Sequence, residues 1–217
     1  MSRIKTVKYH YIFLLLILIV TQSCFQGAVE IKSWLETNST EEAHGTYHFL
    51  ADDGIKIFLP EVFNKYPLIE YTKLLDSLAT SKNEYQQEKK RLNYLRKLDG
   101  NFHIFFDGET RSTYTINTMP YMPLYKKDAQ YLLGMIRLAN EKSVENSDLE
   151  FTKITAKYNA SSGPQVFKVV HRIDNKKTKD FSFNSAYIVS HNNKTIYIQL
   201  SSPYEAGFDP YLEKMIM

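Results

Sequence analysis

The 217-residue sequence has little cysteine, little tryptophan and almost no net charge, and these shortages exclude several classes of protein. The one cysteine, Cys24, excludes an intramolecular disulfide framework and any cysteine-rich metal site. The formal charge of +3 comes from Arg3, Lys5 and Lys8. Without these three of its 27 basic residues, the chain has 24 basic and 24 acidic residues. Such a chain is a poor nucleic-acid binder, since that affinity comes largely from neutralised phosphates.

Signatures of catalytic sites are also missing. The sequence has no GxGxxG, GxxxxGK[ST], GxSxG or HExxH pattern. The pair Asp52-Asp53 is expected to be two solvated turn charges, because neighbours in an extended chain point to opposite sides. His103 and His171 lie in expected strands and are predicted to be hydrogen-bonded sheet residues. We therefore predict no catalytic residue, no metal site and no cofactor.

What the sequence does contain fits a globular domain rich in strands. Hydrophobic residues make up 43% and charged residues 24%, which is ordinary for a folded protein. Aromatic residues reach 14%, and their rings pack well on the pleated surface of a sheet.

Residues 1–23 have the three regions of an export signal. A basic start, MSRIKTVK, precedes the apolar run YIFLLLILIV at 11–20, and the polar residues Thr21-Gln22-Ser23 lead into Cys24. Ten residues span about 15 Å as a helix, half of a ~30 Å hydrocarbon core. The run is therefore short for a permanent span and has the length of a signal-peptide core.

This N-terminus resembles a lipoprotein signal, which places a small residue directly before the modified cysteine. Ser23 matches that position, whereas Thr21 stands where leucine is usual. The resemblance implies a lipoprotein whose mature chain begins at Cys24, carries palmitate there, and is held in the cell-envelope membrane facing the periplasm. There are two alternatives. The segment could be an uncleaved anchor with a free thiol at Cys24, or an ordinary signal peptidase could cleave the chain after Ser23.

After the signal peptide, residues 24–46 read as a lipidated tether and residues 47–217 as one α+β domain. Short polar turns between the last strands predict an antiparallel four-strand meander, with two or three helices packed on the sheet. The expected strands are 54–59, 102–107, 112–118, 149–158, 165–173, 180–190 and 195–200, and the expected helices are 68–98, 126–142 and 209–216.

This element order, with GIKIFLP at 54–60 and a meander that runs into SSPY at 201–204, is similar to the PsbP-like fold. The resemblance implies a non-catalytic accessory or assembly factor. It says nothing about a specific ligand, because function belongs to sites and not to folds.

The segment YTINTMPYMPLY at 114–125 is the most unusual part of the expected domain. Tyrosine and methionine are common at recognition surfaces, because they bury area while they keep a polar or adaptable part. We predict a partner groove formed by Tyr114, Tyr121, Met122 and Tyr125, and the alternative is a connector buried over the sheet edge.

The sequence thus predicts a lipid-anchored binding or accessory module with a protein or a small ligand of the envelope as its partner. Two alternatives remain open. One is an envelope hydrolase that acts on glycan or peptide, and the other is a structural surface lipoprotein without a specific ligand.

Overall fold

The computed structural model describes residues 43–217, apart from 79–81, 146 and 161–162. These residues form one compact unit from Ala43 to Met217. The signal, Cys24 and nearly all of the expected tether lie outside the described residues.

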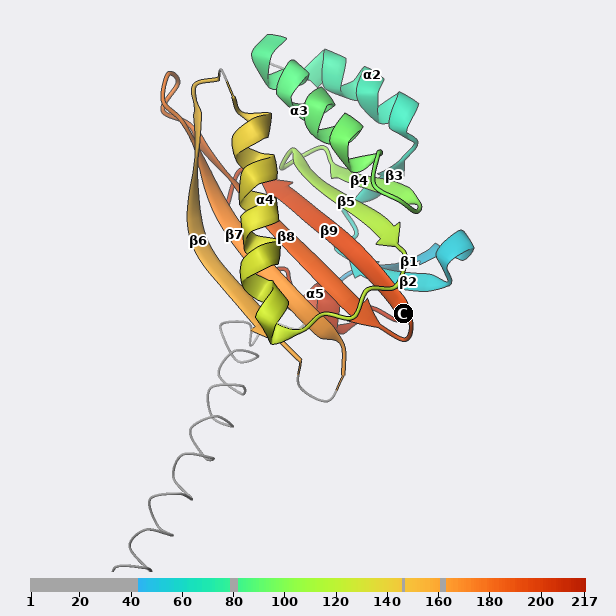
Figure 1. The fold of residues 1–217 in the computed structure, drawn as a ribbon. Coiled ribbons are helices and arrows are strands. Elements are labelled where there is room, and N and C mark those ends of the chain that lie inside the picture. The colour runs from blue at the N-terminus through green and yellow to red at the C-terminus, as the bar shows by residue number, and fades with distance from the viewer. Residues whose placement is uncertain (1–42, 79–81, 146, 161–162) are drawn as a thin grey trace, which may run out of the picture. The chain divides into compact units, whose positions relative to one another are not determined.

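The centre of the unit is a seven-stranded antiparallel sheet in the order β3-β4-β5-β9-β8-β7-β6 (Figure 1). Its last four strands in sequence, β6 to β9, form the predicted C-terminal meander, in which β6 pairs with β7, β7 with β8 and β8 with β9. The strands are β3 (Asn64–Tyr66), β4 (Phe102–Asp107), β5 (Ser112–Met119), β6 (Leu149–Asn159), β7 (Gln165–Asn175), β8 (Phe181–His191) and β9 (Lys194–Ser202).

A hairpin and a short helix cover one face of this sheet. Strands β1 (Thr46–Leu50) and β2 (Ile55–Leu59) pair antiparallel on either side of a 3-10 turn, Ala51–Asp53. Helix α5 (Asp209–Glu213) lies beside them, and the backbones of Lys56 and Ile216 pair with each other. The core on this face includes Leu50, Ile57, Leu59, Phe105, Tyr114, Ile116, Tyr187, Ile198 and Phe208.

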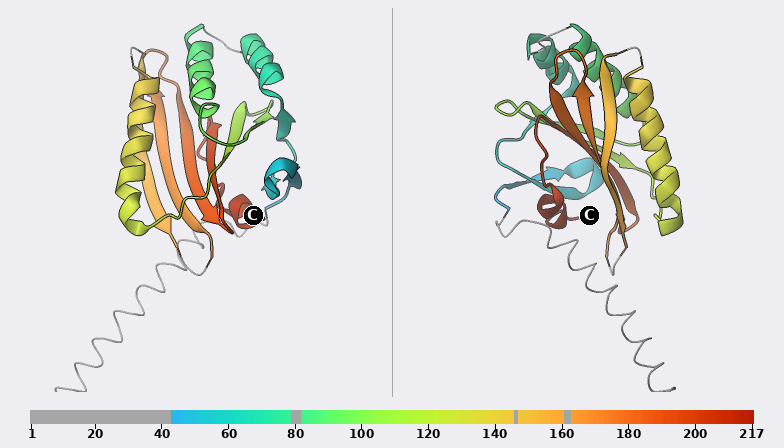
Figure 2. Two further views of the ribbon diagram at one scale, coloured as in Figure 1. Left: turned by 45° about the vertical axis from the view of Figure 1, so that its right-hand side comes forward. Right: turned by 90° about the vertical axis from the view of Figure 1, so that its left-hand side faces the viewer.

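Longer helices cover the opposite face (Figure 2). Helices α2 (Leu68–Leu78) and α3 (Lys82–Leu95) pack over β4, and α4 (Ala129–Ser143), preceded by a 3-10 turn, packs over β7 and β8. The core on this face includes Tyr71, Leu92, Leu95, Ile104, Phe106, Leu132, Ile136, Phe167, Val169 and Ile188.

Helix α3 is attached to the sheet by polar as well as apolar contacts. The guanidinium of Arg91, which also donates to Glu88 on α3 itself at 2.7 Å, donates to Oε1 of Gln199 on β9 at 3.0 Å. The amide of Asn117 donates to the carbonyl of Leu95 at 2.8 Å. These contacts explain why the helix-facing side of β5 and β9 is polar although it is buried, since a buried polar group needs a partner.

The predicted α+β fold class and meander are confirmed, with three differences in detail. The expected helix 68–98 is two helices, α2 and α3, and strands β1 and β3 were not predicted. Because of this division, the described residues contain four α-helices where two or three were expected. The C-terminal helix ends at Glu213 and not at Ile216.

Candidate functional site

The predicted partner groove divides into one core residue and three surface residues. Tyr114 is 2% exposed and packs against Phe208, with ring centroids 4.9 Å apart. Burial raises the pKa of its phenol well above the usual range. Tyr121 is 50%, Met122 38% and Tyr125 51% exposed. The structure therefore brings the last three to the surface and places Tyr114 inside the core.

The backbone of the segment that carries these three side chains is fixed to the sheet. The N–H of Met122 donates to Oγ1 of Thr195 at 2.7 Å, and that hydroxyl donates back to the Met122 carbonyl at 3.1 Å. The N–H of Leu124 donates to Oε1 of Gln165, and the hydroxyl of Tyr158 donates to the Leu124 carbonyl, both at 2.7 Å. The exposed side chains thus stand on an ordered backbone.

Helix α4, which follows this segment in the chain, carries a further exposed stripe that was not predicted from the sequence. Tyr131 is 69%, Met135 50% and Leu138 66% exposed, and their spacing of four and three residues places them on one side of the helix. The core side of α4 carries Leu132 and Ile136. We call the six exposed residues the outer α4 surface: Tyr121, Met122, Tyr125, Tyr131, Met135 and Leu138.

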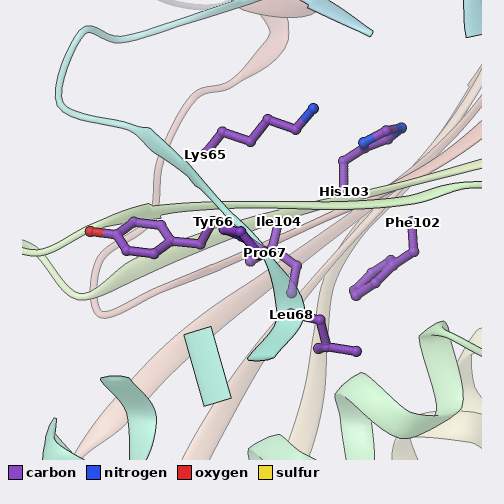
Figure 3. Close-up of a pocket in the computed structure, with 7 residues that line it drawn as sticks. All are labelled: Lys65, Tyr66, Pro67, Leu68, Phe102, His103 and Ile104. Carbon is purple, nitrogen blue, oxygen red and sulfur yellow. The ribbon is translucent and has the colours of Figure 1, made fainter. Parts of the chain in front are cut away.

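A second candidate site is a pocket at the edge of the sheet, where β3 ends and α2 begins (Figure 3). It has a volume of about 360 Å³, within the range of small-ligand sites. The residues that line it are Lys65, Tyr66, Pro67, Leu68, Phe102, His103 and Ile104. We call it the β3–β4 pocket.

His103 in this pocket is held by a carboxylate from the hairpin. Its Nε2 lies 2.8 Å from Oδ2 of Asp53, and both side chains are nearly buried, at 11% and 8% exposed. The other oxygen of Asp53 accepts from Asn101 at 2.8 Å and from Thr118 at 2.7 Å. The prediction that Asp53 is a solvated turn charge is therefore wrong, because the hairpin turn folds back onto β4 and β5. Its neighbour Asp52 is exposed.

The two strand histidines are hydrogen-bonded, as predicted. His103 contacts Asp53, and Nδ1 of His171 lies 3.4 Å from Nδ2 of Asn140 on α4. Burial and the nearby Lys153 lower the pKa of His171. In the described part of the chain, no serine or threonine hydroxyl hydrogen-bonds His103, and the side-chain contact of its ring is with Asp53.

The Asp53 cluster makes a testable contribution to stability. Burial opposes ionisation of the carboxyl, but hydrogen bonds from Thr118, Asn101 and His103 outweigh burial and hold the pKa of Asp53 below its usual value. A carboxyl with a lowered pKa stabilises the fold above its unfolded-state pKa of about 3.9, and this contribution disappears as the pH falls through the folded-state pKa.

We therefore expect Asp53→Asn to lower the free energy of unfolding at pH 7 by about 2 kcal/mol, or the melting temperature by roughly 6 °C. The difference from wild type should shrink steadily below about pH 4. Thermal melts followed by circular dichroism between acidic and neutral pH measure it, with Asp52→Asn as the matched control. Equal effects of the two variants would show that the Asp53 cluster does not stabilise the fold.

Two further findings apply to the described residues only. None of their helices is long and apolar enough to cross a membrane. They also contain no group of three or more histidine, cysteine, aspartate or glutamate side chains placed to hold a metal ion.

Comparison with protein-family models and with curated protein sequences finds no match.

Comparison with solved structures assigns the fold. The chain has an antiparallel sheet with a hairpin on one face and helices on the other. The solution structure of cyanobacterial PsbP (CyanoP) from Synechocystis sp. PCC 6803 has this fold and matches with a TM-score of 0.51. The two sequences are 12% identical, and the match covers 83% of this chain and 96% of CyanoP. The predicted PsbP-like fold is thus confirmed.

Proposed function

We propose that the chain is a lipid-anchored cell-envelope protein, held by Cys24, that acts as a non-catalytic binding or accessory module. The fold is compatible with this role, and CyanoP has the same fold. The observation that carries the proposal is the outer α4 surface, six exposed large apolar side chains on the connector 121–125 and the helix that follows it. Exposed apolar side chains that gather in one region are typical of interaction sites.

The composition of the outer α4 surface favours a protein as its partner. Tyrosine and methionine are enriched at protein interfaces, and the rim of such interfaces is polar. Here Lys127 stacks on the ring of Tyr125, with Nζ 5.4 Å from the centroid, and Arg137 pairs with Glu141 at 2.7 Å. We infer that a protein of the envelope docks along α4, with tyrosine and methionine at the centre of the contact.

The proposal predicts that Tyr121→Ala combined with Tyr125→Ala weakens the complex roughly tenfold or more, because buried tyrosines often dominate interface affinity. A photo-crosslinking residue in place of Met135 would capture the partner in cells, and the yield of the crosslinked species would report binding. The matched control is Tyr94→Ala with Tyr204→Ala, since these tyrosines are 50% and 49% exposed and lie outside the surface. No crosslinked species, or equal yields with both double variants, would contradict the proposal.

A further inference from the structure

The β3–β4 pocket separates a cationic side from an apolar side. Lys65 pairs with Phe105 across β3 and β4, and His103 lies two residues from Phe105. Side chains alternate along a strand, so Lys65 and His103 share the face of the sheet that Phe105 occupies. Phe102 lies on the opposite face, and Figure 3 shows Lys65 and His103 pointing away from Phe102 and Leu68.

The ammonium of Lys65 is the unpaired charge of this pocket. Lys65 is exposed, and within the described residues it makes neither a hydrogen bond nor an ion pair. Both carboxylate oxygens of Asp53, which holds His103, accept hydrogen bonds from Asn101, Thr118 and His103. Burial together with the charge of Lys65 lowers the pKa of His48 on β1. Lys65 therefore lies near two histidines, His48 and His103, and the residues that line the pocket include no carboxylate.

We propose that the β3–β4 pocket binds a small organic carboxylate, with the carboxylate on Nζ of Lys65 and the apolar part against Phe102 and Leu68. His103 lies on the Lys65 side of the sheet edge, and its ring is fixed by Asp53. The proposal is independent of the outer α4 surface, so either can fail without the other.

The lining favours a carboxylate over a phosphate. Phosphate, with two or more charges, is usually held by arginine or by a run of backbone N–H groups around glycine in addition to lysine, and the lining has only the lysine. Five of the seven lining residues are apolar or aromatic: Tyr66, Pro67, Leu68, Phe102 and Ile104. An anion with one charge and a substantial apolar body matches one lysine beside such a wall.

Such a carboxylate has two sources, a free small acid or the last residue of a peptide. The sheet edge is compatible with the second. Strand β3 pairs with β4 only from Ile104 to Phe106. On the edge of β4 that faces β3, Phe102 and His103 therefore have no strand beside them among the described residues. An extended peptide end could lie along this edge, because open strand edges accept extended chains.

Isothermal titration of the full-length chain, solubilised in an uncharged detergent, tests the proposal with 3-phenylpropionate as the probe. We expect saturable binding in the millimolar range or tighter, no binding of the uncharged 3-phenylpropanamide, and affinity roughly tenfold weaker for Lys65→Gln. Lys65 is exposed, so this variant keeps its fold, which a thermal melt verifies. Lys177→Gln, at an exposed turn far along the chain, is the matched control and should bind like wild type.

The peptide Ala-Ala-Phe, with a free or an amidated C-terminus, distinguishes the two sources. Tighter binding of the free-carboxylate peptide than of 3-phenylpropionate assigns the pocket to chain ends, and the reverse assigns it to free acids. Both results support a carboxylate site. Equal binding of the acid and its amide, equal binding by wild type and Lys65→Gln, or no binding of either carboxylate would overturn it.

Discussion

Cys24→Ser is expected to abolish lipid attachment completely, because serine lacks the thiol that accepts the diacylglycerol group. Wild type should incorporate labelled palmitate, and the variant should incorporate none. Each buried methylene contributes about 0.8 kcal/mol to membrane affinity, so loss of the acyl chains removes the stable anchor. Metabolic labelling followed by electrophoresis of the envelope fraction measures both the label and the change in the size of the chain.

Ser23→Ala is the control for this experiment, since it retains a small residue before Cys24 and should remain labelled. Unlabelled wild type, with Cys24→Ser unchanged in size and fractionation, would contradict the lipoprotein assignment. It would favour the uncleaved anchor, and the α+β domain would be unaffected.

Gly100→Ala is expected to destabilise the domain more than any surface substitution. Gly100 has φ of 98°, and a Cβ there would lie 1.5 Å from the carbonyl oxygen of Thr118. The same segment places Asn101 and Thr118, whose backbones pair at 2.9 Å, around Asp53. We expect a loss of about 4 kcal/mol or more, because both the backbone conformation and the close contact are incompatible with a side chain.

Gly134→Ala offers an internal comparison for that variant. Gly134 lies in α4, is exposed, and has no atom within 4 Å of its hypothetical Cβ. Alanine there should stabilise the domain by about 0.5–1 kcal/mol, because glycine is a poor residue inside a helix. Urea unfolding of both variants measures the two free energies, and equal changes would contradict the tight packing of Gly100 against β5.

The sequence predicts the meander well and the first third of the domain less well. Strands β6 to β9 alternate with polar turns, and Asn192 and Asn193 adopt the positive φ values, 46° and 58°, that a tight hairpin requires. Strand β3 has three residues between two prolines, too few for a pattern. Strand β1 resembles a tether because most of its residues are exposed, and its place is set by distant residues, as in the 5.0 Å contact between the rings of His48 and Phe105.

The candidate sites were predictable only in part, for physical reasons. Strand β5 is buried on both faces, so alternation gives no signal that Tyr114 belongs to the core. Tyr131 and Met135 are adjacent in sequence to core residues of α4. Whether an apolar residue of a helix faces the core or the solvent is known only once the packing of the helix is known. The β3–β4 pocket joins residues 65–68 to 102–104 through one strand pairing, and Asp53 reaches it from a separate hairpin.

The most direct test of the central claim is the intact mass of the wild-type protein extracted from its membrane. If the chain is a lipoprotein held by Cys24, we expect a chain that begins at Cys24 and carries the added mass of a diacylglycerol group on that cysteine. A chain that begins at Met1 with an unmodified sulfur would contradict it.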